Sequence, residues 1–338
     1  MSGRQAPLVS VVTPVYNGGE YLRECIESVL AQTYRNWRYV IVNNCSADDT
    51  LEIARQYAAR DPRISVADNE AFLPIVENHN HALTLIDPQS LYCKPVMADD
   101  WLYPECLEQM VACALERPTV GLVCASALTG TDRVLFDRLP AAGAQRTYLT
   151  GREAGRTGLL EDGYFFGSPT TMLMRTDLVR ARAVFYNPEN LQADEEACYD
   201  ILRECDFGFV HQVLAYVRAH ARSYTSGTYY LFAMPSCHTY TLARYGHDYL
   251  SEAEFAQRME ARLQQYYARL ALGAVEHRGE EFWAYHRHML QMIGAPLDRV
   301  KLGGAIAAHV ARKVVSPSSL LRAIGGRIAS ASRWVTGR

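Results

Sequence analysis

The first 126 residues alternate between short apolar runs and segments in which apolar residues recur at every third or fourth position. Residues 9–13 (VSVVT) form one such run, and apolar pairs at helical spacing follow over residues 20–32. This alternation is typical of parallel β-α-β units, because a helix carries the chain back before the next parallel strand begins. The sequence therefore predicts an α/β fold with a mainly parallel sheet flanked by helices. The expected strands are residues 9–13, 39–42, 64–67, 91–97 and 120–126, and the expected helices are residues 20–32, 50–60, 75–86 and 104–117.

The pattern weakens after this region. Residues 128–163 are rich in Gly, Ala and Arg and show little periodicity, which predicts a flexible segment. Strand-like and helix-like patterns return over residues 170–217, and from about Tyr230 we expect helices to the end of the chain.

The composition excludes several classes of protein. A net charge of −3 gives no reason to expect nucleic-acid binding, and no apolar run reaches the length of about 18 residues that a membrane span needs. The first residues lack the basic start and long apolar stretch of a secretory signal, so we expect a cytoplasmic protein. The nine cysteines include no CxxC pair, which favours free, buried thiols over disulfides or zinc ligands.

Polar residues follow the first two expected strands. In parallel sheets, ligands bind beyond the carboxyl ends of the strands. Pro14, Tyr16 and Asn17 follow the first strand, where a tyrosine either stacks on a planar base or packs on its own helix. Asn43 and Asn44 follow the second, where amides suit a base edge but also form ordinary turns before a helix.

An acidic pair, Asp99 and Asp100, follows the apolar run 91–97 in the stretch MADDWLYPE. Adjacent carboxylates repel each other, so such a pair is often held by a cation. Mg²⁺ or Mn²⁺ can join one carboxylate to a diphosphate. The alternative is an acidic helix start, which the helix macrodipole favours.

The three strand ends together resemble the family 2 glycosyltransferases. The matching stretches are residues 10–50, residues 78–83 (NHNHAL) and residues 97–105, and the resemblance extends over residues 8 to about 220. The family has the GT-A fold and transfers a sugar from a nucleotide diphosphate, commonly a UDP-sugar. The resemblance thus implies an enzyme with a nucleotide-sugar donor.

The resemblance also implies a domain organisation. Residues 1–228 would form the glycosyltransferase domain, with a nucleotide-binding half over about 8–127 and an acceptor or catalytic half over about 128–228. Residues 229–338 would form a helical C-terminal region with a basic tail, 301–338.

The family's roles map onto the first two strand ends. Pro14 would bind the base through its backbone and Tyr16 by stacking, with Asn17 beside them. Relatives usually end the second strand in two aspartates, of which the latter accepts from the base. Here Asn44 takes that position, and an amide oxygen still accepts from a ring N–H.

The resemblance places the diphosphate beside the acidic pair. Asp99 would lie near the ribose or donor sugar, and Asp100 would bind the metal, Mn²⁺ or Mg²⁺. Many relatives have another aspartate two positions before the pair, where this chain has Met97. In the stretch YVRAHARSYTS, Arg218 and His220 would face the diphosphate as charge partner and metal ligand; the alternative is that both are surface residues.

A catalytic base is expected after the segment GSPTTMLMR, residues 167–175. The resemblance makes Asp194 the first choice and Glu195 the second, whereas the residues alone fit helix capping equally well. The base would deprotonate the acceptor hydroxyl for a single in-line displacement that inverts the anomeric carbon. Asn80 is a further candidate for the donor side.

Two other functions compete with this interpretation. A sugar nucleotidyltransferase needs a basic, glycine-rich loop after the first strand, and PVYNGGEY has no basic residue. A degenerate member that binds nucleotide or glycan without turnover is supported by the asparagine pair and the absence of an acid at Met97.

The basic tail suggests a membrane surface. Residues 301–338 contain seven basic side chains and no acidic one. A basic amphipathic helix can rest on anionic lipid, and many relatives act on lipid-linked acceptors; the alternative is a tail packed on the catalytic domain. We therefore expect a glycan or lipid-linked acceptor, and peripheral association with the inner face of the membrane if the tail binds lipid. Four apolar residues lie near one helical face and three arginines largely elsewhere: Leu321, Ile324, Ile328 and Val335, and Arg322, Arg327 and Arg333.

Overall fold

The computed structural model describes residues 6–130, 133–135, 147–161, 166–220 and 231–315. The chain divides into two compact units. Unit 1 contains Met1–Ser226 and Tyr245–Ser251, and unit 2 contains Gly227–Arg244 and Glu252–Arg338.

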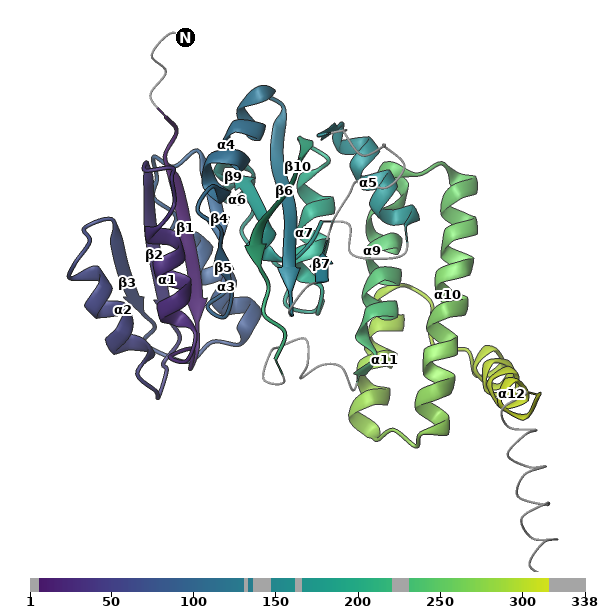
Figure 1. Ribbon diagram of the computed structural model, residues 1–338. Coiled ribbons are helices and arrows are strands. Elements are labelled where there is room, and N and C mark those ends of the chain that lie inside the picture. Colours follow the sequence, from purple (N-terminus) through teal and green to yellow (C-terminus); the bar gives the residue numbers. More distant parts are fainter. Residues whose placement is uncertain (1–5, 131–132, 136–146, 162–165, 221–230, 316–338) are drawn as a thin grey trace, which may run out of the picture. The chain divides into compact units, whose positions relative to one another are not determined.

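Unit 1 is built on a single sheet with helices on both faces (Figure 1). In the described part of the chain, its main path runs β3-β2-β1-β4-β9-β6-β10-β5, with β7 paired to β6 and β8 to β10. The predicted parallel pairing is confirmed for the first four strands. The sheet as a whole is mixed, because β9 runs antiparallel to both of its neighbours. The strands are β1 (Val9–Val15), β2 (Trp37–Asn43), β3 (Ile64–Asp68), β4 (Tyr92–Pro95), β5 (Trp101–Leu102), β6 (Val120–Thr129), β7 (Arg133–Leu135), β8 (Tyr148–Leu149), β9 (Met172–Arg175) and β10 (Asp206–Tyr216).

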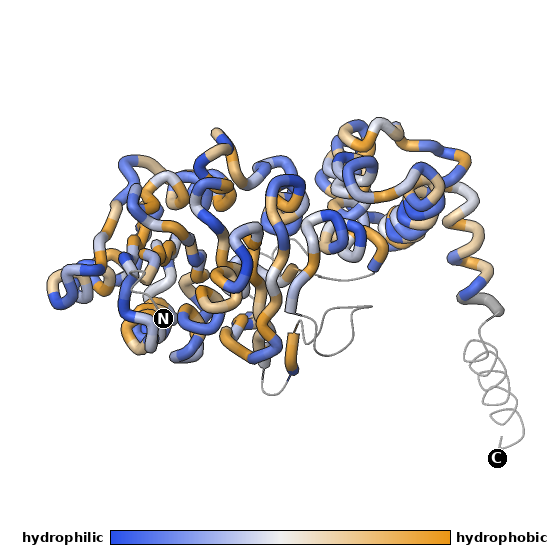
Figure 2. Tube along the Cα trace, turned by 90° about the horizontal axis from the view of Figure 1, so that it is seen from above, coloured by the Kyte–Doolittle hydropathy of each residue, from blue (hydrophilic) through white to orange (hydrophobic). Residues whose placement is uncertain are grey.

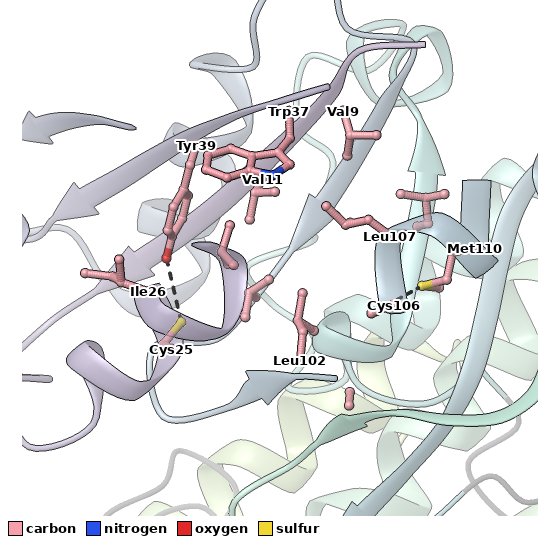
Figure 3. Close-up of a cluster of buried hydrophobic side chains, with 14 of the residues drawn as sticks. Val9, Val11, Cys25, Ile26, Trp37, Tyr39, Leu102, Cys106, Leu107 and Met110 are labelled. Carbon is pink, nitrogen blue, oxygen red and sulfur yellow. Dashed lines mark hydrogen bonds between the residues drawn. The ribbon is translucent and has the colours of Figure 1, made fainter. Parts of the chain in front are cut away.

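The helices expected in the first half are confirmed, with ends shifted by a few residues. Helix α1 turns its buried face, which includes Cys25 and Ile26, towards Trp37 and Tyr39 of β2 (Figure 3). Burial of an aliphatic or aromatic side chain contributes about 1.5–3 kcal/mol each, so this cluster holds α1 on the sheet. These helices are α1 (Leu22–Leu30), α2 (Thr50–Ala58), α3 (Ile75–Thr84) and α4 (Cys106–Glu116).

A buried polar chain aligns the strand ends. The Tyr39 hydroxyl donates to Thr13 Oγ1 at 2.8 Å, and Thr13 Oγ1 donates to the Val96 carbonyl at 2.8 Å. These hydrogen bonds link β2, β1 and the residue after β4, and they satisfy hydroxyls that would otherwise be costly to bury. The three strands that end at the candidate site are therefore held in register.

The prediction of a flexible segment over 128–163 is wrong for its last part. Residues Gly151–Leu160 form helix α5, which begins at a capping box between Thr150 and Glu153. Its buried face is largely glycine and alanine, so the apolar periodicity was weak. A Cβ on Gly151 would lie 2.1 Å from the Leu202 carbonyl oxygen, and one on Gly155 would lie 2.4 Å from the Tyr249 ring. The glycines thus permit close packing.

The second half of unit 1 completes the sheet. A short 3₁₀ turn, η1 (Pro169–Thr171), precedes β9, and helices α6 (Thr176–Arg180) and α7 (Ala193–Ile201) follow. The predicted patterns over 170–217 are therefore confirmed. All nine cysteines are free; seven are buried, whereas Cys113 is partly buried and Cys45 is exposed.

Unit 2 is helical over its described residues, as predicted. Apolar and hydrophilic residues alternate along its helices (Figure 2). Its core includes Tyr266, Leu270 and Phe282, and Leu302 and Ala305 of α12 pack against it. The first part of the basic tail is therefore a packed helix; residues 316–338 lie outside the described part of the chain. The helices are α9 (Ala233–Tyr249, of which 233–244 belong to this unit), α10 (Glu252–Val275), α11 (Glu280–Met292) and α12 (Arg299–Val315).

None of the helices in the described ranges is both long and apolar enough to cross a membrane.

His286 is a buried, neutral member of the unit 2 core. Its Nε2 donates to the Leu231 carbonyl at 2.8 Å, so Nδ1 accepts from the Tyr266 hydroxyl at 2.9 Å. Burial lowers the pKa of His286 from 6.5 to about 4. The unfolded chain therefore binds the proton first, and the stability that depends on neutral His286 is complete above pH 6.5 and lost as the pH falls to 4.

We expect the free energy of unfolding of the wild type to lose about 3 kcal/mol relative to His286→Gln between about pH 7 and pH 4. Urea titrations of both proteins across this range measure the difference between their free energies of unfolding. The other titrating groups are the same in both proteins, so their contributions cancel. A difference that stays constant with pH contradicts the assignment.

Candidate active site

The loops after β1 and β2 are tied together at the carboxyl end of the sheet. Asn17 has a positive φ of 49°. Its backbone N–H donates to Ser46 Oγ at 2.9 Å, and its side-chain oxygen accepts from the Ala47 N–H at 2.8 Å. Asn17 thus fixes the turn after Pro14, which leaves the Tyr16 ring 52% exposed at the strand end.

Asn44 is buried, and both the nitrogen and the oxygen of its side-chain amide form hydrogen bonds. Its side-chain nitrogen donates to the Leu73 carbonyl at 2.7 Å. Its side-chain oxygen accepts from the Leu73 N–H at 2.9 Å and from the Asn69 amide at 2.9 Å. Asn43 is also used within the chain, because its side chain donates to Asp68 at 2.7 Å. Both amides therefore have defined structural contacts.

Asp100 is the most buried carboxylate at the end of β4, with an exposed fraction of 4%. One oxygen accepts from the Thr170 hydroxyl at 2.5 Å and the other from the Arg218 N–H at 2.8 Å. Burial, reinforced by the charge of Asp99, raises the pKa of Asp100 to about 7. The protein thus holds a carboxylate whose negative charge it only partly compensates.

The structure brings Arg218 and His220 to the acidic pair; their roles toward the diphosphate stay a prediction. His220 Nε2 lies 2.9 Å from Asp99 Oδ2, and Arg218 Nε donates to the Asp99 carbonyl at 2.8 Å. Arg218 also pairs with Glu24, and its guanidinium lies 4.5 Å from the centre of the Tyr21 ring. Arg218 thus links the acidic pair to the start of α1.

The acidic pair fits a divalent cation that a bound phosphate group helps to hold. No group of three or more His, Cys, Asp or Glu side chains within the described ranges is arranged to bind a metal alone. The buried Asp100 nevertheless supplies a hard oxygen ligand whose raised pKa a cation would lower, with Asp99 and His220 beside it. Such a donor set suits an ion whose other ligands are phosphate oxygens and water.

Sequence reasoning missed two residues behind Asp100. Lys94 is fully buried in β4, and its ammonium donates to the carbonyls of Thr170 and of Met172, the latter at 3.1 Å. It anchors the turn whose Thr170 hydroxyl holds Asp100. Burial lowers the pKa of Lys94. The one available signal was a lone lysine inside the apolar run 91–96, whereas nothing in the sequence marked Thr170.

Met97 contacts a histidine from α3. His79 Nε2 lies 3.2 Å from the Met97 sulfur, and Nδ1 lies 2.6 Å from the Ile75 carbonyl. Burial lowers the pKa of His79, which favours the neutral ring. Met97 occupies the position at which many relatives carry a further aspartate, and both Met97 and the His79 ring that contacts it are neutral.

Asp194 lies in the first turn of α7, which confirms that the acidic residues stand at a helix start. Burial raises the pKa of Asp194 to about 7, the neighbouring charge of Glu195 adds to the shift, and backbone N–H groups of the turn oppose it. Glu195 is buried beside it. Glu196 is structural, since it accepts from Asn190 at 2.8 Å.

Asn80 is used within the chain. Its side chain donates to the Tyr186 carbonyl at 2.7 Å and accepts from the Tyr186 N–H at 2.8 Å. Burial raises the pKa of Tyr186, and the charge of Asp194 adds to the shift. The loop before α7, which this clamp holds, therefore lies near the candidate base.

Comparison with known proteins places this site in a family. The sequence model described as glycosyl transferase family 2 matches residues 10–182, just over half of the chain. The chain belongs to glycosyl transferase family 2. The resemblance seen in the sequence is therefore confirmed.

Curated relatives agree with this assignment. A Bacillus subtilis protein named as glycosyltransferase EpsE is 34% identical over 140 residues, which are 41% of this chain and 48% of that protein. The B. subtilis glycosyltransferase TuaG, named for teichuronic acid biosynthesis, is 34% identical over 134 residues, 40% of this chain and 50% of that protein. The chain spans about half the length of these curated relatives.

Solved structures share the fold. TarS of S. aureus in complex with UDP-GlcNAc aligns with a TM-score of 0.62 at 18% identity, over 84% of this chain and 81% of that chain. The mannosyltransferase PcManGT from Pyrobaculum calidifontis, in complex with GDP-Man and Mn²⁺, aligns with a TM-score of 0.58 at 17% identity, over 96% and 81%. The predicted GT-A fold is confirmed.

The hydroxyl of Thr170 stabilises the charged form of Asp100, so Thr170→Val should raise the pKa of Asp100 by about one unit above its wild-type value near 7. An NMR titration of the Asp100 carboxyl carbon measures the shift. Thr171→Val is the matched control: Thr171 is equally buried, but its hydroxyl donates to the Ser168 carbonyl. An equal shift in both variants, or none in Thr170→Val, contradicts the assignment.

Proposed function

We propose that this family 2 glycosyltransferase is an inverting, metal-dependent enzyme that transfers a sugar from a nucleotide diphosphate, most simply a UDP-sugar, to a hydroxyl of a glycan or lipid-linked acceptor. Its role would be the synthesis of a surface polysaccharide. The names of TuaG and EpsE and the ligands in the TarS and PcManGT structures support this proposal.

The observation that carries the proposal is a pair of shielded carboxylates on separate elements: Asp100 is buried, and Asp194 is half-buried beside the buried Glu195. Asp100 follows β4 and Asp194 begins α7, and the pKa of each is raised to about 7. A base whose pKa lies near the working pH accepts a proton most effectively. Asp100 suits a cation because its two oxygens accept hydrogen bonds and Asp99 and His220 lie beside it, whereas Asp194, in the first turn of α7, suits a proton acceptor.

The residues of the chain would divide the reaction as follows. Asp194 removes the proton of the acceptor hydroxyl as its oxygen attacks the anomeric carbon, with Glu195 as the second choice. Arg218 and His220 stabilise the negative charge that develops on the leaving diphosphate. Asp99 lies on the side of the ribose and donor sugar. Attack and departure on opposite faces of the anomeric carbon invert its configuration.

A bound Mn²⁺ or Mg²⁺ would supply charge neutralisation of the diphosphate, held by Asp100 with His220 nearby. The nucleotide would lie at the ends of β1 and β2, against the Pro14 backbone and the Tyr16 ring, with Asn17 and Asn44 shaping the loops around it.

A degenerate, binding-only member of the fold is the second candidate. The asparagines at positions 43 and 44 and the neutral residue at Met97 favour it. Metal-dependent sugar transfer or donor hydrolysis that disappears in Asp100→Ala supports the enzyme. Nucleotide binding without turnover over a panel of donors and acceptors supports the degenerate member.

The pH dependence tests the base. Because Asp194 must be deprotonated and its pKa is about 7, kcat/KM should fall about tenfold per pH unit below that value and level off above it. Asp194→Asn should lower transfer by about 10²–10⁴-fold.

Asp200→Asn is the control for this experiment, because Asp200 lies on the same helix but pairs with Arg182 and Arg203. Full transfer by Asp194→Asn, or an equal loss in both variants, rules out the assignment.

Membrane association is tested by deleting residues 316–338, since α12 extends to Val315 and belongs to the unit 2 fold. The truncated protein should co-sediment less with vesicles containing phosphatidylglycerol, and neither protein should bind neutral phosphatidylcholine vesicles, because the attraction is electrostatic. Unchanged partitioning of the truncated protein would show that the tail does not bind lipid.

A further inference from the structure

Tyr16 has an aromatic neighbour that the sequence did not reveal. The ring of Phe72, from the loop after β3, lies 5.0 Å from the Tyr16 ring between centroids, at an interplanar angle of 66°. The two side chains are 52% and 56% exposed. We call this pair the aromatic corner. Exposing two large aromatic rings side by side is unfavourable in water, which is typical of a binding surface.

The corner depends on a small closed loop. Residues 69–73 leave the end of β3, and both ends of this loop bond to Asn44. The Asn69 side chain donates to the Asn44 oxygen, while the Leu73 backbone bonds to the Asn44 side chain through its N–H and its carbonyl. The Asn69 N–H also donates to the Asn43 carbonyl at 2.9 Å. Phe72 therefore projects from a loop that Asn44 holds shut.

The chemistry of these bonds requires an amide at position 44. The side chain must accept from two N–H groups and also donate to the Leu73 carbonyl. An ionised aspartate accepts but cannot donate, so it would leave that carbonyl without its partner and place a charge in a buried position. An asparagine can thus form all three of these hydrogen bonds, whereas the carboxylate that relatives usually carry at this position cannot.

We propose that Phe72 is a second residue on which the nucleobase of the donor packs beside Tyr16, and that Asn44 is a positioning residue that holds Phe72 in place. This inference rests on the proposed function. The base is then recognised by stacking and by backbone groups near Pro14, not by the side chain at position 44.

The proposal has a consequence for donor choice. Every nucleobase has a π face, so stacking discriminates weakly between bases. The site should therefore accept uridine and guanosine diphosphates with affinities of the same order, and the sugar and diphosphate contacts should set the choice of donor.

Isothermal titration of UDP, GDP, CDP and ADP in the presence of Mn²⁺ tests the proposal. Phe72→Ala should weaken all four nucleotides by about tenfold, and Phe72→Tyr should restore binding, because both aromatic rings stack. Leu115→Ala is the control, since Leu115 is 53% exposed on α4. Phe72 is exposed, so its replacement leaves the folded core intact. Unchanged affinity in Phe72→Ala overturns the proposal.

Asn44→Asp separates a positioning role from direct reading of the base. If Asn44 acts through Phe72, Asn44→Asp weakens all four nucleotides alike, and the double variant with Phe72→Ala binds no worse than the weaker single variant. Tighter or newly selective UDP binding by Asn44→Asp would show that residue 44 reads the base and would overturn the proposal. Failure of the wild type to bind any of the four nucleotides would instead refute the proposed function.

Discussion

The site is organised around one buried carboxylate. Asp100 accepts from the Thr170 hydroxyl and from the Arg218 N–H, so it joins the end of β4, the turn before β9 and the end of β10. A carboxylate in this position is costly unless hydrogen bonds or a cation compensate it. The antiparallel strand β9 and the buried Lys94 are what bring Thr170 there. This tie and the antiparallel pairing of β5 with the end of β10 together bring the acidic pair to the downstream Arg218–His220 segment.

Much of the fold of residues 8–127 could be predicted from the sequence pattern. Buried parallel strands such as Val9–Val15 are continuous apolar runs, and their helices repeat apolar residues at helical spacing, so both periods were visible. Because parallel strands end on the same edge of the sheet, the order of Tyr16, Asn44 and Asp99–Asp100 along the chain also predicted that they converge. Asp194 was placed correctly at a helix start for the same kind of local reason.

What could not be predicted depended on contacts between distant residues. Helix α5 buries Gly151 and Gly155 against close neighbours, so its buried face carries almost no apolar signal. The antiparallel direction of β9 is set by its two neighbours in the sheet, not by its own residues. The role of Asn44 required knowing that the loop over residues 69–73 folds back on it. In each case the missing information was the identity of the partner.

The central claim is that the ends of β1, β2, β4 and β10 form one nucleotide-sugar site. A crystal structure with UDP and Mn²⁺, using the anomalous scattering of manganese, tests it most directly. We predict a manganese peak between Asp100 and the diphosphate, with the uracil ring against Tyr16. A manganese ion that binds the diphosphate away from Asp100, or a nucleotide bound elsewhere on the chain, would contradict this account.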